Sequence, residues 1–388
     1  MARIQNVETI HVSLPLRREH KWAGLTEDIG GYLLVKMTDE DGGVGWGEAP
    51  VLKDWGGDFG RYFGESPAIA KLVIDTYLLP ALSGADPTNI IELHARMDRA
   101  IKGYPYSKAA VEFAAYDLAG RQLGVPVFTL LGGRARDAIP MAHSIGLIDF
   151  KEAEKEVAQV IEEGIRTIKI KIGVDAGRDV EMVRRIRAVT GDGIELCVDA
   201  NNGYTTPGQA IRAIKAMEAH HIKYAEQPVE GAARLAQVAR AVDVPIMADE
   251  SAWNAHDVID LAERRAAQYI SIYTTKSGGL FKSMEVAAVA RAAGMPCNVN
   301  GSIETGIGNL ANVQLSAAAP AVTLACVYGV STPREAQLGQ LACIYYLDDL
   351  LTEPMTLVDG ALRVPDGPGM GMEVDLEKVA KYTLPDNA

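Results

Sequence analysis

A chain of 388 residues is too long for one small hydrophobic core, so its length predicts two domains, one with room to be a barrel. Hydrophobic residues make up 48% and charged residues 23%, which excludes a largely disordered chain. The formal net charge of −13 argues against nucleic acid as a partner. It does not exclude an anionic substrate, because a metal ion and nearby lysines can reverse the field at a site.

The sequence also predicts the cellular location of the protein. It contains no apolar run of about 18 residues, so we expect no membrane-spanning helix. The first residues resemble neither a signal peptide nor a transit peptide. The four cysteines lie in apolar runs without CxxC spacing, as expected of reduced core residues: Cys197, Cys297, Cys326 and Cys343. Together these features predict a cytoplasmic protein.

The first third of the chain predicts an α+β unit. Alternating patterns indicate three strands, at residues 4–13, 32–38 and 43–48. Apolar positions at three- and four-residue spacing then indicate helices at 68–82, 89–101 and 108–123. Two long loops, 15–31 and 49–66, are rich in basic or aromatic residues. Loops of this length are either surface loops with a small apolar cluster or functional lids, and the sequence leaves both interpretations open.

From about residue 138 strands and helices alternate strictly. The pattern predicts strands near 139–146, 167–172, 194–199, 222–226, 245–249, 268–274, 296–300 and 321–327. Helices are expected between them at 150–163, 177–189, 206–219, 231–241, 255–264, 279–293 and 306–318. This order is typical of a (β/α)8-type barrel, and no glycine-rich phosphate loop supports the rival open sheet. We therefore predict an α/β protein with a capping domain at 1–134, a barrel at 135–351 and a tail, 352–388, that packs back on the cap.

One predicted strand carries charges on a single face. In the sequence Thr-Ile-Lys-Ile-Lys-Ile-Gly, Lys169 and Lys171 share a face because side chains at i and i+2 point the same way. Two buried ammonium groups are costly unless anionic groups meet them. Carboxylates end the next three predicted strands, at Asp199, Glu226 and Asp249. In a barrel the active site lies at these strand ends.

The residue types at these strand ends favour one chemistry. Ligands that are all oxygen suit Mg²⁺, with Mn²⁺ as the alternative, whereas zinc is disfavoured because no histidine or thiolate lies among them. A cation that binds a substrate carboxylate and stabilises its enediolate form allows a lysine to remove the α-proton. A charged Lys169 is expected to lower the pKa of Lys171 from about 10.4 and so make it a better base.

Several motifs together resemble the muconate-lactonizing subgroup of the enolase superfamily, over nearly the whole chain. They are Ala115-Tyr-Asp-Leu118, Leu130-Leu-Gly-Gly133, Lys169-Ile-Lys171, Val198-Asp-Ala-Asn-Asn-Gly203, Ala225-Glu-Gln-Pro228, Ala248-Asp-Glu-Ser251, Ser277-Gly-Gly279, Gly301-Ser-Ile-Glu-Thr305 and Pro365-Asp-Gly-Pro-Gly369. The superfamily uses a lysine or histidine base with Mg²⁺ that stabilises an enediolate.

The resemblance implies roles for individual residues. It implies that Asp199, Glu226 and Asp249 bind the metal, that Lys171 is the base and that Lys169 is its partner. Residues expected to support this set are Asn201, Glu250, Lys276 and Glu304. Candidate substrate contacts, on the lid loops and near the seventh strand, are Lys21, Trp22, Lys53, Trp55, Asn300 and Ser302. The resemblance also implies a homo-oligomer, whose number the sequence does not fix.

The departures from the family pattern separate the functional hypotheses. Most members of the subgroup carry a second catalytic lysine on the sixth strand, where this chain has Tyr273. Tyr273 is either an aromatic residue that fills space, a weak acid or a substrate hydrogen-bond partner. The relatives that racemise dipeptides have paired aspartates on the eighth strand, where this chain has Cys326-Val-Tyr328. A dipeptide is therefore not the expected substrate.

Three functions follow. The favoured one is a lyase, dehydratase or cycloisomerase that uses Lys171 as its one base on a carboxylate, since an elimination or a lactone closure needs only one. The second is a racemase or epimerase with another group near Tyr273 or Lys276. The third is a non-catalytic binding relative, which the intact set of carboxylates and lysines argues against.

Overall fold

The computed structural model describes residues 1–25, 29, 31–301, 304–330 and 340–385. Its N-terminal part is an antiparallel sheet of three strands in the order β1 (Ile4–Ser13), β2 (Gly31–Asp39) and β3 (Val44–Ala49). The helices of this part are α1 (Pro67–Val73), α2 (Leu79–Leu82), α3 (Ile90–Ala100), α4 (Pro105–Leu123) and α5 (Val127–Leu130). The three predicted strands are present, and a π-helical turn, η2 (Ile74–Leu78), joins α1 to α2 within the predicted helix 68–82.

Helix α4 packs directly on strand β3. Two glycines of β3 make this close approach feasible: a Cβ at Gly45 would lie 2.1 Å from the Ala114 carbonyl oxygen, and one at Gly47 would lie 2.0 Å from that of Ala110. The helix is buried over most of its length, although Ser107, Lys108, Glu112 and Asp117 are among its buried residues. Because a side chain on either glycine would push helix and sheet apart, these two positions fix the inner layer of the N-terminal part.

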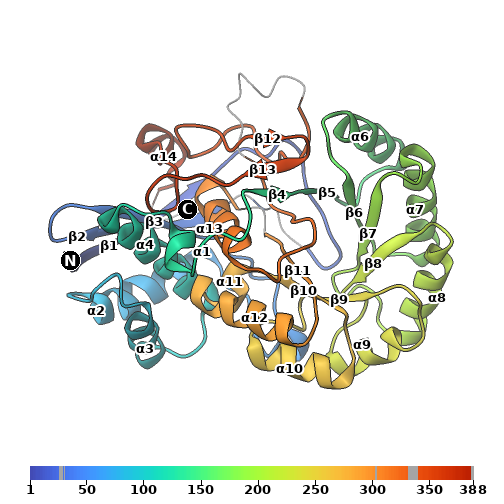
Figure 1. Cartoon of the computed structure of the whole chain (residues 1–388), viewed down its shortest axis with the longest axis horizontal. Coiled ribbons are helices and arrows are strands. Elements are labelled where there is room, and N and C mark those ends of the chain that lie inside the picture. Colours follow the sequence, from blue (N-terminus) through green and yellow to red (C-terminus); the bar gives the residue numbers. More distant parts are fainter. Residues whose placement is uncertain (26–28, 30, 302–303, 331–339, 386–388) are drawn as a thin grey trace.

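The larger part of the chain is a curled parallel sheet surrounded by helices (Figure 1). Within the described residues it has seven strands, which follow the chain order in space: β5 (Ala142–Ile145), β6 (Thr167–Lys171), β7 (Glu195–Asp199), β8 (Ile222–Glu226), β9 (Ile246–Ala248), β10 (Tyr269–Ile272) and β11 (Cys297–Val299). The helices are α6 (Phe150–Glu162), α7 (Ala176–Thr190), α8 (Pro207–Glu218), α9 (Ala232–Ala239), α10 (Ala255–Arg264), α11 (Thr274–Ser277), α12 (Leu280–Ala292) and α13 (Gly306–Ala318).

The eighth predicted strand is not a regular strand. Residues 321–327 make isolated parallel bridges, from Val322 and Val327 toward β11 on one side and from Cys326 to Met141 on the other. The regular ladder is interrupted because the N–H groups of Thr323 and Leu324 both donate to the Cys297 carbonyl, at 3.0 and 3.1 Å. The segment thus bridges the two edges of the curled sheet, and the prediction of eight full strands is corrected to seven.

The C-terminal tail contacts both parts of the chain. Strands β12 (Leu357–Val358) and β13 (Ala361–Arg363) form a small antiparallel sheet with β4 (Ala138–Pro140). Helix α14 (Leu376–Tyr382) is followed by a bridge from Thr383 to Val12 of β1. The tail therefore does reach back to the N-terminal sheet, while the domain bounds at 134 and 351 stay a prediction. Over the described residues, no helix combines the length and apolar character needed to cross a membrane.

Candidate active site

The register of the parallel strands brings the charged strand ends together. Lys171 is aligned with Asp199 across β6 and β7, and Asp199 is aligned with Glu226 across β7 and β8. Because parallel strands end at the same edge of a sheet, three successive strands present these side chains side by side. Asp249 directly follows β9, the next strand in the same sheet.

The two lysines of β6 share one aspartate. Lys169 Nζ lies 2.9 Å from Asp199 Oδ2 and 2.9 Å from Glu226 Oε1. Lys171 Nζ lies 2.7 Å from the same Asp199 oxygen and donates a hydrogen bond of 2.6 Å to Asn201 Oδ1. Both lysine side chains are at least nine-tenths buried, so their charges are met by these carboxylates rather than by bulk water.

A third lysine pairs with the third carboxylate. Lys276 Nζ donates to Asp249 Oδ1 at 2.7 Å, to the Asp249 carbonyl at 2.8 Å and to the Ser271 carbonyl at 3.0 Å. An ammonium group has three N–H donors, so all three are engaged here. Its side chain has no exposed surface. Lys276 is therefore held as a fixed partner of Asp249.

Two of the expected supporting residues join the lid loop to the strand ends. Asn201 donates to Glu250 Oε1 at 3.1 Å, and the indole N–H of Trp55 donates to the same oxygen at 3.3 Å. Asn300, predicted as a substrate contact, instead donates to Glu226 Oε1 at 3.1 Å and to Ser271 Oγ at 2.9 Å. Asn300 therefore contacts Glu226 and holds the orientation of its carboxylate.

The electrostatics of the strand ends are those of crowded, buried charges. Burial raises the pKa of Asp199, but Lys169 and Lys171 outweigh it and hold that pKa at about 2. Burial and the neighbouring Asp199 raise the pKa of Glu226 to about 8. Burial lowers the pKa of Lys169, yet Asp199 and Glu226 together bring it above its ordinary value. The carboxylates outnumber the ammonium groups by one here, counting Asp199, Glu226, Asp249 and Glu250 against Lys169, Lys171 and Lys276.

The carboxylate oxygens left over suit a hard cation. Among the described carboxylates at these strand ends, three buried oxygens have no hydrogen-bond partner: Glu226 Oε2, Asp249 Oδ2 and Glu250 Oε2. Buried carboxylate oxygens are ordinarily satisfied, and Mg²⁺ is a cation that takes such ligands. In the same described part, no three acidic, histidine or cysteine side chains lie grouped closely enough to hold a metal as they stand. The donor set fits a divalent cation. The lysines pair with other oxygens of the same carboxylates, Lys169 with Asp199 Oδ2 and Glu226 Oε1 and Lys276 with Asp249 Oδ1.

The lysines of β6 face a narrow cavity of about 40 Å³. Its lining includes Lys169, Lys171, Asn201 and Tyr273. A larger outer cavity of about 240 Å³ adjoins it, since Trp22, Leu52, Trp55 and Asn201 line both. The Lys171 ammonium lies 5.6 Å from the centre of the Trp22 ring. The predicted contacts Trp22 and Trp55 therefore line the same cavity as the two lysines of β6.

The remaining predicted contacts have separate outcomes. Lys53 lines only the outer cavity. Lys21 lines neither cavity; it lies at the surface, where its ammonium is 2.6 Å from Glu19 and half exposed. The backbone of Lys21 is nevertheless held in place, because its carbonyl accepts a hydrogen bond from the Leu147 N–H. Ser302 lies outside the described residues. Glu304 is buried against Gly301, which lines the narrow cavity.

The loop at 51–66 is docked on the curled sheet. Asp58 accepts hydrogen bonds of 3.0 Å from the Gly231 N–H and from the Ser251 hydroxyl. The rings of Tyr62 and Trp253 are stacked, with centroids 4.4 Å apart and an interplanar angle of 5°. Of the two interpretations left open by the sequence, these contacts and the cavity lining favour a lid.

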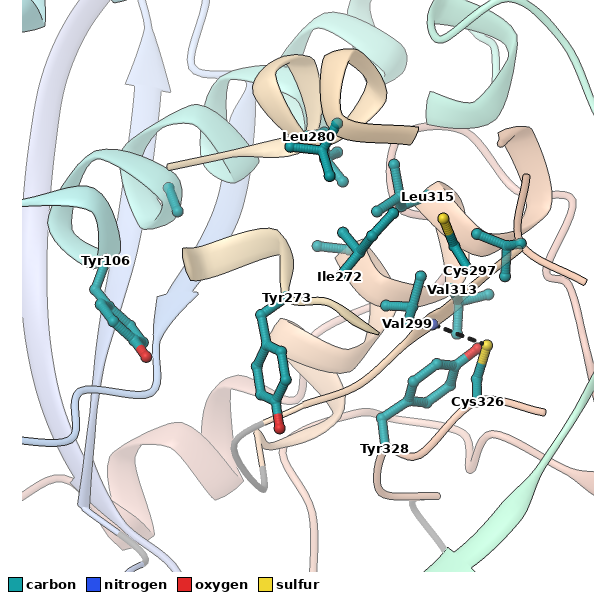
Figure 2. Close-up of a cluster of buried hydrophobic side chains, with 14 of the residues drawn as sticks. Tyr106, Ile272, Tyr273, Leu280, Cys297, Val299, Val313, Leu315, Cys326 and Tyr328 are labelled. Atoms are coloured by element: carbon teal, nitrogen blue, oxygen red, sulfur yellow. Dashed lines mark hydrogen bonds between the residues drawn. The ribbon is translucent and has the colours of Figure 1, made fainter. Parts of the chain in front are cut away.

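Tyr273 packs within an aromatic group beneath the lid. Its ring lies 5.2 Å from the ring of Trp55, and the Lys276 ammonium lies 5.1 Å from its centre. Figure 2 shows the ring directed away from the apolar cluster of Ile272, Leu280 and Leu315, whereas the Tyr328 hydroxyl points toward Cys326. Burial and the nearby carboxylates raise the pKa of Tyr273 well above 10. Tyr273 is therefore present as the neutral phenol at neutral pH.

Sequence reasoning missed several residues that line the narrow cavity: His20, Ser144, Tyr328 and Tyr345. His20 stands next to the predicted Lys21 in a loop already marked by its composition. A loop has no alternating pattern that distinguishes inward from outward side chains, so Lys21 and His20 could not be told apart from the sequence. Tyr345 comes from the segment after residue 340, where no predicted strand end marked a site.

Comparisons with known proteins decide the family. The N-terminal domain model of mandelate racemase/muconate lactonizing enzyme matches residues 4–132, and the enolase C-terminal domain-like model matches residues 152–379. Muconate cycloisomerase 1 of Rhodococcus opacus is 33% identical over 390 residues, covering 98% of each chain. The chain belongs to the enolase superfamily.

Further relatives place this enolase-superfamily enzyme in the muconate-lactonizing subgroup. Muconate cycloisomerase 1-1 of Acinetobacter lwoffii is 35% identical over 382 residues, which cover 98% of this chain and 96% of the relative. The solved muconate lactonizing enzyme of Pseudomonas fluorescens with muconolactone is 31% identical, with a TM-score of 0.88 over 99% of this chain and 100% of that one. The N-succinyl Arg/Lys racemase of Bacillus cereus, a solved structure with 25% identity, has a TM-score of 0.89 over 99% of this chain and 98% of that one. The relatives are isomerases, so the site belongs to an enzyme.

Proposed function

We propose that this enzyme removes the α-proton of a small carboxylate substrate with one base, Lys171, in a lyase, dehydratase or cycloisomerase reaction. The observation that carries the proposal is the position of Lys171 Nζ, which acts as a base in its neutral amine form. The side chain lines the narrow cavity, as does Asn201, and its Nζ is held by Asp199 and Asn201 at 2.7 and 2.6 Å. A base must lie within hydrogen-bond reach of the proton that it takes, and this wall provides such reach to a bound substrate.

Lys169 prepares the site for an anion. Its raised pKa keeps it protonated, because Asp199 and Glu226 stabilise the ammonium form. It lines the same cavity as Lys171, so a substrate carboxylate can accept from it. Its position between two carboxylates fixes it there, since moving would break contacts of 2.9 Å to both. Lys169 thereby orients the carboxylate while Lys171 takes the proton.

Asp199, Glu226 and Asp249 would hold a divalent cation, Mg²⁺ or Mn²⁺. Partnerless oxygens on Glu226 and Asp249 support this assignment. When bound, such a cation supplies stabilisation of the negative charge that develops on the substrate carboxylate as the proton leaves. The residues around these ligands limit how they turn: Asn300 fixes Glu226, and Lys276 fixes Asp249.

The surroundings of Lys276 and Tyr273 favour one base over two. Lys276 uses all three donors on Asp249 and Ser271 and lines neither cavity. Tyr273 does line the narrow cavity, but a phenol, with an ordinary pKa near 10, is largely protonated at neutral pH and is therefore a poor base. A racemase needs a group on each face that can both take and deliver a proton. Racemisation is the second candidate, because relatives include the N-succinyl-L-Arg/Lys racemase of Bacillus cereus and the L-Ala-D/L-Glu epimerase of Bacillus subtilis.

The cavity lining suggests the substrate class. Beyond the reacting end the outer cavity is lined by the aromatic rings of Trp22 and Trp55, by one lysine, Lys53, and by two carboxylates, Asp54 and Glu250. The rings suit a compact carboxylic acid with a π-rich group, and Lys53 can pair with a second anionic group. Muconate, after which the cycloisomerase relatives are named, has both a second carboxylate and conjugated double bonds, so it is the first probe to test. The homo-oligomer stays a prediction alongside this proposal.

Replacement of Lys171 tests the proposal. We expect Lys171→Ala to lower turnover of cis,cis-muconate, or of the carboxylate that screening shows to be turned over, by at least about 1000-fold, as expected for loss of a general acid–base group. With muconate, closing the lactone adds a proton to the α-carbon, so the protonated Lys171 delivers this proton and removes the same proton when the lactone opens. The control is Lys223→Ala on β8, which removes a half-exposed lysine that pairs with Glu195 instead of the site. Full activity of Lys171→Ala, with the control equally active, would refute the role of Lys171.

A further inference from the structure

One buried carboxylate outside the strand ends accepts three donors from two segments, the loop at 15–25 and strand β5. Glu156, on α6, receives Arg17 Nη2 at 3.3 Å, Arg18 Nη2 at 2.7 Å and His143 Nε2 at 2.8 Å, all on its Oε1. Its side chain is 5% exposed. Burial raises the pKa of this carboxyl, but His143 and Arg18 outweigh it and bring the pKa well below the ordinary value. Glu156 therefore stays ionised, and three cationic or polar donors depend on it.

The first arm of this cluster runs through His143 to a strained turn. The N–H of Cys343 donates to His143 Nδ1 at 3.0 Å, so a neutral His143 carries its proton on Nε2 and donates to Glu156. Cys343 has φ of +59°, the left-handed conformation that side-chain-bearing residues seldom adopt. Such a conformation persists only when surrounding contacts hold it. His143 provides one of those contacts, and Tyr345 follows two residues later.

The second arm runs through the arginines to the loop at 15–25. Arg17 donates from its backbone N–H to the Tyr345 carbonyl at 2.8 Å and from Nε to the Ile344 carbonyl at 2.9 Å. The rings of His20 and Tyr345 meet edge to face, with centroids 5.2 Å apart and an interplanar angle of 81°. Both rings line the narrow cavity together with Lys169 and Lys171.

The two arms thus converge on one wall of the cavity. We propose that Glu156 is a positioning residue: through Arg17 and Arg18 on one side and His143 on the other, it sets His20 and Tyr345 against each other beside the lysine pair. Without the charge of Glu156, the loop at 15–25 and the Cys343 turn are no longer held by one carboxylate, and His20 and Tyr345 move apart. The positioning itself does not depend on the proposed function; its consequence for turnover rests on that function.

Hydrogen–deuterium exchange on the full chain tests the positioning directly. Glu156→Gln keeps the shape but removes the charge, and we expect amide exchange to rise about tenfold or more in both 15–25 and 341–347, with no rise in 195–201 and 222–228. Arg18→Ala cuts only the loop arm, so exchange should rise in 15–25 and stay unchanged in 341–347. The matched control is Glu181→Gln, whose carboxylate receives Arg184 and Arg185 on the outer helix α7.

The outcomes separate positioning from general stabilisation. Unchanged exchange in both segments of Glu156→Gln overturns the proposal, and so does a rise spread evenly over the chain. Should Glu156→Gln not fold, Arg18→Ala alone decides, because a rise outside 15–25, or none there, contradicts the arrangement of the arms.

A kinetic measurement follows the consequence for the site. With cis,cis-muconate as the probe substrate, Glu156→Gln should raise KM at least about fivefold and change kcat less, since a displaced wall weakens binding while Lys171 stays in place. Loss of kcat with KM unchanged would contradict a positioning role at the wall. If the unaltered protein does not turn over muconate, the choice of substrate in the proposed function fails, and the exchange experiment still decides the role of Glu156.

Discussion

Tyr273 occupies the place where, by the family resemblance, the subgroup most often has a second lysine. Its surroundings show how the chain accommodates a tyrosine at this position. The ring packs on Trp55, and the Lys276 ammonium lies over its face. A space-filling role needs the ring and not the hydroxyl. We therefore expect Tyr273→Phe to keep kcat within about threefold, because it conserves the packed ring and removes no proton carrier.

Steady-state kinetics of Tyr273→Phe beside Tyr328→Phe, a second tyrosine of the same cavity, provide the check. A loss of more than about 100-fold in Tyr273→Phe alone would indicate that the hydroxyl transfers a proton.

Glu226 tests the cation assignment with a readout that does not require turnover. Saturating Mg²⁺ should raise the free energy of unfolding by about 2.7 kcal/mol at 100 times Kd, because the cation binds the folded state. Glu226→Gln should lose most of this gain, since it removes one charged oxygen ligand. The measurement is thermal unfolding with and without Mg²⁺, and Glu195→Gln, on the outer end of the neighbouring strand β7, is the control. An equal Mg²⁺-dependent gain in Glu226→Gln would contradict the assignment.

At the scale of elements, Glu48 joins strand β3 to the start of helix α13. It accepts hydrogen bonds from the Thr305 N–H at 2.9 Å, from the Gly308 N–H at 3.0 Å and from the Thr305 hydroxyl. Burial raises its pKa to about 8 from an ordinary 4.5. The folded state therefore holds this proton more tightly than the unfolded state, and the stabilisation is present below about pH 4.5 and lost as pH rises to about 8.

Glu48→Gln should accordingly remove part of the pH dependence of stability. Between about pH 5 and pH 8 the free energy of unfolding of the unaltered protein should fall relative to that of the variant by up to about 1.4 kcal/mol per pH unit. Denaturant unfolding at several pH values in this range measures the difference. Parallel curves for the two proteins would mean that Glu48 is ionised in the folded state.

The same scale shows why most elements follow from the sequence and one does not. The helices from 150 to 318 and the first seven strands of the curled sheet lie close to their predicted positions, because each buries one periodic apolar face. The segment 321–327 has an equally apolar pattern. Its pairing is set by the Cys297 carbonyl, which accepts hydrogen bonds from both Thr323 and Leu324. This contact is long-range, so a local sequence pattern does not encode it.

At the scale of the whole molecule, the strand ends could be predicted and the cavity walls could not. Lys169, Lys171, Asp199 and Glu226 follow from alternation and from the rule that parallel strands end at one edge. His20 and Tyr345 lie 325 residues apart in the chain, and long-range contacts bring them together: the backbone hydrogen bond from Arg17 to Tyr345 and the cluster on Glu156. Lys21 was predicted from its charge, yet the loop turns it outward to Glu19.

The central claim is that one base acts on one face of the substrate, and isotope exchange in D₂O tests it most directly. A chiral substrate recovered after partial turnover should carry deuterium at the α-carbon with its configuration retained, because Lys171 returns the deuteron to the face from which it took the proton. Lys171→Ala should show no exchange. Recovery of deuterated substrate with inverted configuration from the unaltered enzyme would contradict the account.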